Sequence, residues 1–515
     1  MADPVIQTPP PLERADLAAW LAVAAGTLGA LMATLDISIV NSSLPTIQGE
    51  IGASGTDGTW VATSYLVAEI VIIPMAAWFQ RVLGLRSFLL IAATLFTMFS
   101  VVCGTANTLT VMIIGRVGQG FTGGALIPTA QTIIAMRLPR HQQPIGIAAF
   151  GVTAIMGPVM GPLIGGWLTE NVSWHYAFFL NLPVCAALLT LLILGLPHER
   201  SDLSQFAKAD WWGIVGLALG LGGLTVLLEE GQRELWFAST LIRQVAVVSL
   251  IGFISLGIGQ WRSARPVIKL RLLADRQFGA VATMGLVLGM VLYGTSYVIP
   301  QFLALVSNYN ALQSGKIVLI SGLPSLFMMA IVPILLKRID VRIAVAGGLL
   351  IMGLSSLLDA ELSSDADGSN FIASQLMRGV GQILGMLFLS QACVRSVPRE
   401  DAGDASGLFN AMRNLGGSLA LAGIGIVQDQ RQWLHTRRLE EGLHANSPLV
   451  QAKVRAMGGM LRALPQLEAQ MQLQALVMTF NDIFWIMGLG TMVVLPLVLL
   501  LRPFSTDAAP AAAMH

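Results

Sequence analysis

A series of long apolar stretches, which follow one another from residue 17 to residue 501, is the feature that most constrains this chain. A helix needs roughly 20 mostly apolar residues to cross a bilayer. Barrel strands would be only about 10 residues long with alternating polarity, so helices are predicted. The fourteen predicted spans are 17–40, 59–80, 87–106, 109–132, 145–168, 176–196, 211–229, 241–260, 278–304, 316–336, 342–359, 371–394, 405–427 and 476–501.

The composition excludes a water-soluble protein. Only 11% of the residues are charged and 55% are hydrophobic, whereas soluble domains carry about 25% charged residues. The net charge of +1 gives no indication of a nucleic-acid partner. Three widely spaced cysteines in apolar runs and six scattered histidines predict neither a disulfide framework nor a metal site. We therefore expect an all-α membrane protein without a cofactor or metal.

The short connections indicate the orientation. Most of their lysines and arginines fall on the side of the amino end, the even-numbered connections and the carboxyl tail. By the positive-inside rule, both termini are predicted to be cytoplasmic. The first stretch is longer than the apolar core of a signal peptide and is interpreted as retained. The long connection 428–475 falls outside, and its pattern predicts one or two amphipathic helices lying over the outer surface.

Two segments resemble each other and suggest an internal repeat. Segments 115–151 and 377–409 each contain an arginine followed by Gly-Gln, a loop with two arginines around a proline, and a Gly/Ala-rich stretch. Chance similarity of Gly-rich segments is the alternative. A repeat predicts two six-helix halves with substrate between them. The predicted organisation is a cytoplasmic tail 1–16, an N-terminal half 17–196, an inserted helix pair with flanking loops 197–270, a C-terminal half 271–503 that includes loop 428–475, and a disordered tail 504–515.

Charged residues at membrane depth are the best candidates for function, because an intramembrane charge costs several kcal/mol unless it is paired or used. Asp36, Glu69, Arg116, Arg378 and Arg413 lie within predicted spans. A buried carboxylate beside a cation can load and release protons, so Asp36, tuned by Arg116, is the first candidate for proton coupling, and Glu69 is the second. The alternative is that both acids are structural partners of Arg116.

A Gly-Pro string lies in stretch 145–168. Glycines four residues apart make a smooth helix face, and prolines bend a helix, so the string suits an interface that moves between the halves. Ordinary close packing is the alternative. Its residues are Gly157, Pro158, Gly161, Pro162, Gly165 and Gly166.

Several strings resemble motifs of the major facilitator superfamily, in particular its fourteen-helix drug:proton antiporter branch and the EmrB-like multidrug exporters. LDISIVN at 35–41 and TWVATSY at 59–65 match motifs of the first two helices of that branch. GRVGQG at 115–120 matches the superfamily's RxxQG motif, and the Gly-Pro string resembles its antiporter motif GxxxGPxxGGxL. WHYAFFLNLP at 174–183 and NDIFW at 481–485 are also similar to this group.

The resemblance implies a proton-driven exporter of the bacterial inner membrane that works by alternating access. It also implies a periplasmic membrane-fusion adaptor and an outer-membrane channel as partners. We predict that the substrate cavity is lined by Asp36, Asn41, Tyr65, Glu69, Gln119, Tyr293, Tyr297, Gln301, Arg378 and Asn410. Two departures from the pattern stand out: Arg81 occupies a loop position where aspartate is common, and EmrB-type chains usually lack an acid at the position of Glu69.

Other functions are weaker readings. A stand-alone exporter of one metabolite, siderophore or organic acid remains the alternative within transport. A membrane-embedded enzyme would need a His/Asp/Glu cluster or a nucleophile with a base at membrane depth, and the sequence suggests none. A sensor would need a soluble signalling domain, and the sequence suggests none of these either.

Overall fold

The computed structural model describes residues 14–502, apart from 54–56, 200, 203, 208, 264–265, 443–450, 452–454 and 456–459. Within these residues every regular element is helical, as the apolar stretches predict. The helices are α1 (Leu17–Ile51), α2 (Trp60–Leu83), α3 (Leu85–Gly104), α4 (Leu109–Gly123), α5 (Leu126–Arg137), α6 (Gln143–Asn171), α7 (His175–Phe179), α8 (Asn181–Gly195), α9 (Ser204–Ala207), α10 (Trp211–Glu230), α11 (Thr240–Arg262), α12 (Arg276–Leu305), α13 (Ala311–Leu319), α14 (Gly322–Arg338), α15 (Val341–Leu358), α16 (Ile372–Arg395), α17 (Ala402–Gly442) and α19 (Met460–Val493).

Polar caps start several helices at the predicted boundaries. The Asp16 carboxylate accepts a hydrogen bond from the Ala19 amide at 2.8 Å at the start of α1, and Asp210 does the same for the Gly213 amide at the start of α10. Such caps satisfy backbone donors that a helix leaves free at its first turn. Gly52 caps the carboxyl end of α1, and its positive φ of 71° is the left-handed conformation that glycine adopts without strain.

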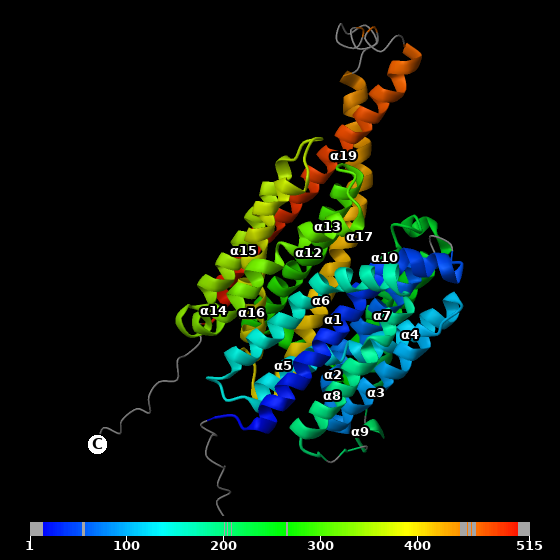
Figure 1. Ribbon diagram of the computed structural model, residues 1–515. Coiled ribbons are helices and arrows are strands. Elements are labelled where there is room, and N and C mark those ends of the chain that lie inside the picture. The colour runs from blue at the N-terminus through cyan, green and yellow to red at the C-terminus, as the bar shows by residue number, and fades with distance from the viewer. Residues whose placement is uncertain are drawn as a thin grey trace, which may run out of the picture.

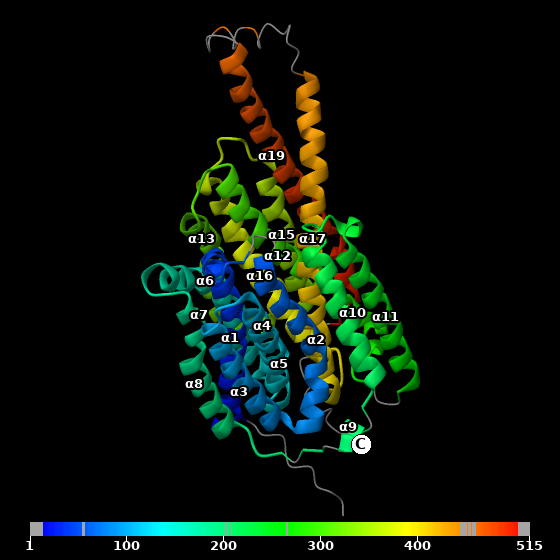
Figure 2. The same cartoon turned by 90° about the vertical axis from the view of Figure 1, so that its right-hand side faces the viewer.

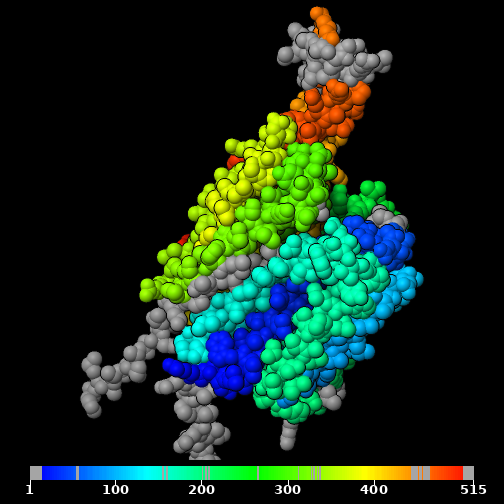
Figure 3. Space-filling model, viewed as in Figure 1, coloured from blue at the N-terminus to red at the C-terminus, as the bar shows by residue number. Residues whose placement is uncertain are grey.

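Two bundles make up the molecule. α1 to α8 pack on one another, and α12 to α17 pack with α19. α2 and α5 contact α17, and α6 contacts α14, so these helices form the interface between the bundles. Figure 3 shows α1 on the surface of the first bundle, between α6 and α8. The start of α1 and the last described turn, Leu495–Leu500, lie at the same end of the molecule, which we call the terminal end (Figure 1).

The pair α10–α11 packs as a hairpin against the flank of both bundles. α10 contacts α11, α2 and α17, and Figure 2 shows the pair beside these two helices. Gly216 and Gly252 let the pair approach closely, since an added Cβ on Gly216 would lie 2.3 Å from the backbone nitrogen of Leu256. α10 therefore touches the interface between the bundles.

Ten helices among the described residues are long and apolar enough to cross a membrane. Predicted spans 109–132, 145–168, 316–336 and 405–427 are also helical but are not among the ten. Span 109–132 is divided between α4 and α5 at Gly124. Span 405–427 lies in α17 and carries polar residues such as Asn410, Arg413 and Asn414. The structure thus gives a multi-pass helical membrane protein, and the count of fourteen stays a prediction.

The connection 428–475 differs from the sequence prediction. Its described parts do not lie over the surface. α17 continues without a break to Gly442, and α19 begins at Met460, so both helices project from the bundle as a pair opposite the terminal end (Figure 1). Near its base His435 hydrogen-bonds Asp482 at 2.8 Å, and Arg431 lies 3.5 Å from the same carboxylate. These contacts join the two helices near the base of the projecting pair.

Candidate functional site

Asp36 and Arg116 form a fully buried ion pair in the first bundle. Arg116 Nη1 on α4 lies 2.6 Å from Asp36 Oδ2 on α1, and both side chains have at most 1% of their surface exposed. The other carboxylate oxygen accepts hydrogen bonds from Asn181 Nδ2 at 2.7 Å and from Gln119 Nε2 at 3.2 Å. The pairing of Asp36 with Arg116 that the sequence suggested is therefore present in the structure.

Further polar groups complete this network. Arg116 Nε donates to the carbonyl of Val61 at 3.1 Å, and its guanidinium carbon lies 4.2 Å from the centre of the Tyr65 ring. Ser100 Oγ accepts from the amides of Gln119 and Asn181. Removing one partner from such a network would leave a buried charge uncompensated, which is strongly unfavourable.

Glycines of α4 bring this helix against α2. A Cβ on Gly120 would lie 2.3 Å from the carbonyl oxygen of Tyr65, and one on Gly124 would lie 2.8 Å from Glu69 Cγ. Only glycine allows this approach. The GRVGQG string therefore does two things, since it supplies Arg116 and Gln119 and also sets α2 close beside them.

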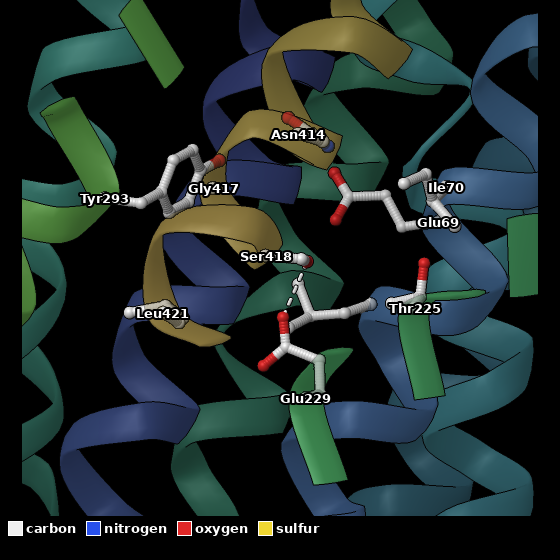
Figure 4. Close-up of a pocket in the computed structure, with 10 residues that line it drawn as sticks. Glu69, Ile70, Thr225, Glu229, Tyr293, Asn414, Gly417, Ser418 and Leu421 are labelled. Carbon is white, nitrogen blue, oxygen red and sulfur yellow. Dashed lines mark hydrogen bonds between the residues drawn. The ribbon is translucent and has the colours of Figure 1, made fainter. Parts of the chain in front are cut away.

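A cavity lies between the bundles and contains Glu69. Its volume is about 40 Å³, room for a few water molecules and far below that of a drug-sized site. α2, α10, α12 and α17 all contribute to its wall, and Figure 4 shows Glu69 facing Asn414 across it. The polar residues of the lining are Glu69, Thr225, Glu229, Tyr293, Asn414 and Ser418. Leu66, Ile70, Gly417 and Leu421 form the rest of the wall.

Of the residues predicted to line the cavity, only Glu69 and Tyr293 do so. Asp36, Gln119 and Tyr65 belong to the buried network described above. Asn41 and Tyr297 are exposed, Gln301 accepts a hydrogen bond from Gln428 at 2.7 Å, and Asn410 is buried against Gln131 at 3.0 Å.

Sequence reasoning missed Glu229, Thr225, Asn414 and Ser418. Glu229 and Glu230 close an otherwise apolar stretch, and the predicted span 211–229 ends there. Two consecutive glutamates on a helix that packs against the central helices were the available signal. Glu229 in fact accepts a hydrogen bond from Ser418 Oγ at 2.6 Å inside the cavity (Figure 4).

The arginines predicted at membrane depth in the second bundle have separate partners. Arg378 Nη2 lies 2.9 Å from Asp359 Oδ2, and both side chains are buried. Like Arg116, Arg378 therefore pairs with one buried carboxylate. Arg413 is buried as well and donates to Met386 Sδ and to Asn414 Oδ1. Arg378 lies outside the cavity lining, whereas Arg413 is adjacent to it through Asn414.

The Gly-Pro string lies in α6, but its glycines do not face the other bundle. A Cβ on Gly157, Gly161 or Gly165 would lie 2.1–2.3 Å from a side-chain atom of Thr34, Ser38 or Ser42 on α1. The predicted glycine face is therefore present, but it packs within the first bundle. Gly166 has nothing within 4 Å of an added Cβ, and Pro162 is exposed. The side chain of Pro158 lies outside the described residues.

A second set of ion pairs joins the bundles near the terminal end. Arg81 Nη1 on α2 lies 2.8 Å from Asp404 Oδ2 on α17, and Lys269 Nζ lies 3.3 Å from the same oxygen. Lys269 also pairs with Asp401. Nearby, Ser406 Oγ donates to Gln131 Oε1 at 2.6 Å across the same interface. Arg81, at a position where aspartate is common in the resembling branch, thus joins the two bundles.

These contacts predict unequal effects of two substitutions. Asp404→Asn removes the partner of two cations, whereas Arg81→Gln leaves Lys269 on Asp404. In a Ser406→Cys background we expect a hydrophilic maleimide to label the purified protein about tenfold faster with Asp404→Asn and only about twofold faster with Arg81→Gln. The double variant should match Asp404→Asn. Equal rates for the two single variants would show that the pairs do not hold this interface closed.

Among the described residues, no group of three or more His, Cys, Asp or Glu side chains could hold a metal ion. Two helical bundles that enclose buried ion pairs and a cavity at their interface define a membrane transporter, a class in which substrate binds between the halves. The chain belongs to the Major Facilitator Superfamily, whose family model matches residues 26–421. This is a family of transporters and not of enzymes.

Individual relatives agree with this assignment. The chain is 32% identical to the colistin resistance protein EmrB of Acinetobacter baumannii, over 90% of this chain and 93% of that protein. It is 28% identical to the multidrug export protein EmrB of Escherichia coli, over 97% and 98%. The solved structure of the proton:xylose symporter XylE superposes with a TM-score of 0.62 at 14% identity, covering 93% of this chain and 94% of that one. The last likeness shows the fold alone.

Proposed function

We propose that this protein is a proton-driven antiporter of the bacterial inner membrane that exports hydrophobic or amphipathic drugs by alternating access. The single observation that supports this most is the buried Asp36–Arg116 pair beside a cavity that lies between two bundles. In the conformation described here, the Asp36 carboxylate has no access to water and is paired with the Arg116 cation. When the bundles rearrange, the carboxylate can exchange that partner for a proton. The multidrug export names of the relatives support drugs as the substrate class.

The orientation and the partners are part of the same proposal. The bias of basic residues places the terminal end in the cytoplasm, so the ion pairs of Arg81 and Lys269 close the cytoplasmic side. The projecting parts of α17 and α19 then reach into the periplasm, where they contact a membrane-fusion adaptor that leads to an outer-membrane channel. The pair α10–α11 is the insertion that raises a twelve-helix plan to fourteen.

The deciding experiment is a substrate panel in everted vesicles. Uptake of amphipathic cations, neutral amphiphiles and organic acids is measured with the pH gradient present and then collapsed by an ionophore. We expect gradient-dependent uptake of chemically unrelated compounds. Uptake of one compound alone would favour the stand-alone exporter of a single metabolite, siderophore or organic acid. Uptake that is indifferent to the gradient would reject proton coupling, and co-purification tests the adaptor.

Glu69 gives a sharper test of substrate charge. Glu69 is 2% exposed, and its carboxylate faces the cavity beside Asn414. Glu69→Gln removes the negative charge but keeps the shape, and it leaves nearby Arg413 uncompensated. We expect transport of a permanent organic cation to fall about tenfold or more while transport of a neutral amphiphile changes by about twofold or less. An equal loss for both compounds would mean that Glu69 does not distinguish a cationic substrate from a neutral one.

A further inference from the structure

The carboxyl end of α10 and the turn that follows it contact both bundles. On the side of the first bundle, Glu230 is buried and accepts a hydrogen bond from Thr63 Oγ1 of α2 at 2.5 Å. A Cβ on Gly222 of α10 would lie 3.5 Å from side-chain atoms of Val67 and Val71, so apolar packing extends this contact along α2. These buried contacts fix α10 to the first bundle.

The contacts of the same segment with the second bundle are made by polar side chains. Glu229 accepts a hydrogen bond from Ser418 Oγ of α17 at 2.6 Å at the cavity wall (Figure 4). In the turn after α10, Gln232 donates a hydrogen bond to the Asp429 carboxylate of α17 in an exposed position. Water competes for such hydrogen bonds, so each adds only modest stability. We call these two contacts, Glu229–Ser418 and Gln232–Asp429, the strap.

The turn after α10 is held in a strained conformation. Leu235 and Trp236 have positive φ values of 55° and 53°, which residues other than glycine rarely adopt. The indole nitrogen of Trp236 donates to Gln232 Oε1 at 2.8 Å, and the amide nitrogen of Gln232 donates to Asp429. Strain of this kind persists only where surrounding contacts impose it. Here the strained turn places Gln232 against α17.

The size of the cavity indicates that the strap must open. A volume of about 40 Å³ admits only a few water molecules, so the walls must separate before a drug-sized molecule fits. α2 and α10 form one part of the wall, and α12 and α17 form another. Because buried contacts fix α10 to α2, a separation of these walls moves α17 away from α10 and breaks the strap.

We propose that the inserted pair α10–α11 moves with the first bundle and acts as a releasable strap on α17. The strap stabilises the described state, and its release lets the cavity widen for substrate. The inserted helices then have a role of their own in the conformational cycle. This inference rests on the proposed alternating access, but it depends neither on the proton nor on the identity of the substrate.

A disulfide across the strap tests this role. A Cβ on Gly425 of α17 would lie 3.6 Å from Gln232 Cβ, within the range of disulfides, and the three native cysteines are buried. Exchange of labelled for unlabelled substrate is measured in proteoliposomes without a pH gradient. We expect oxidation of the Gly425→Cys/Gln232→Cys protein to reduce exchange about tenfold or more, and dithiothreitol to restore it.

The chain offers a matched control in Gly353→Cys/Thr491→Cys, which links α15 to α19 within the second bundle. A Cβ on Gly353 would lie 3.5 Å from Thr491 Cβ, so the geometry is similar but the disulfide does not cross between the bundles. Oxidation should change exchange by about twofold or less in this variant. An equal loss in both variants, or no loss with the disulfide across the strap, would overturn the proposal.

A labelling measurement covers the case in which the disulfide variant does not fold. Ser406→Cys reports on opening at the terminal end, and Ser418→Ala with Asp429→Ala removes both partners of the strap on α17. The described state then loses stability, and a hydrophilic maleimide is expected to label the purified protein about threefold faster than with Ser406→Cys alone. An unchanged rate would contradict the strap. Because this measurement needs neither drug nor pH gradient, a failure of proton-driven export would reject the proposed function and leave the labelling result standing.

Discussion

Asp36→Asn is expected to abolish proton-driven export, with accumulation in everted vesicles reduced at least a hundredfold. Asparagine keeps the shape of the side chain and an oxygen that can accept hydrogen bonds from Asn181 and Gln119. It cannot bind and release a proton, so a rearrangement of the bundles would no longer be coupled to proton entry. It also leaves the buried Arg116 without its counter-charge, a change that costs about 3–5 kcal/mol where no other partner is found.

The measurement must separate lost coupling from lost structure. Exchange of labelled for unlabelled substrate across the membrane needs the bundles to move but needs no net proton flow. We expect the Asp36→Asn protein to retain exchange within about threefold of the wild type while it loses accumulation. Full accumulation driven by the pH gradient would remove Asp36 from the mechanism, and loss of exchange as well would indicate a structural role.

Asp359 supplies a control of the same chemistry. It pairs with Arg378 at 2.9 Å, and both groups are buried, as in the Asp36–Arg116 pair. Asp359, however, lies in a short 3-10 turn that follows α15, away from the cavity between the bundles. Asp359→Asn should therefore reduce stability but keep gradient-driven accumulation. If both substitutions abolish accumulation equally, a buried arginine left without its partner explains the loss, and proton transfer at Asp36 is not needed.

The sequence correctly predicted the features that depend on one segment of the chain alone. Apolar length predicts a helix without knowledge of its neighbours, and the high cost of a charge in lipid identified Asp36, Glu69, Arg116, Arg378 and Arg413 as residues with partners or roles. All five are buried in the structure. The motif at 115–120 identified Arg116, whereas Gln119, predicted to line the cavity, hydrogen-bonds Arg116 and Asp36 instead.

The cavity was harder to predict because it depends on how helices far apart in the chain meet. Glu229 belongs to a helix that the repeat argument had set aside as an insertion, yet α10 packs against α2 and α17. Asn414 and Ser418 lie on a polar face of α17. The Gly-rich pattern of this segment does not show which neighbouring helices that face meets. The same limit applies to the glycines of α6, since their spacing predicts a smooth face but not which helix it meets.

The direction of that glycine face leads to the second large effect. α1 presents Thr34, Ser38 and Ser42 at a spacing of four, and each lies opposite one glycine of α6. An added Cβ on Gly161 would be 2.1 Å from Ser38 Cβ and 3.0 Å from the Ser38 carbonyl carbon. Neither atom can rotate away, so Gly161→Ala forces α1 and α6 apart. Overpacking of this kind costs roughly 1–3 kcal/mol.

Gly161→Ala is expected to lower the thermal unfolding midpoint of the purified protein by several degrees, as measured by intrinsic tryptophan fluorescence. It should also reduce transport, because Asp36 lies on the same helix, α1, as Ser38. Gly166→Ala is the matched control in the same string. Nothing lies within 4 Å of its added Cβ, and alanine in a helix is favoured over glycine by about 0.5–1 kcal/mol. Its midpoint should stay the same or rise.

Adding Ser38→Gly to Gly161→Ala removes one of the two clashing atoms and should recover part of the loss. Equal midpoints for Gly161→Ala and Gly166→Ala would contradict the close α1–α6 contact. A normal midpoint with lost transport would instead mean that the glycines permit motion of α6 along α1, and their role would then lie in the transport cycle and not in stability.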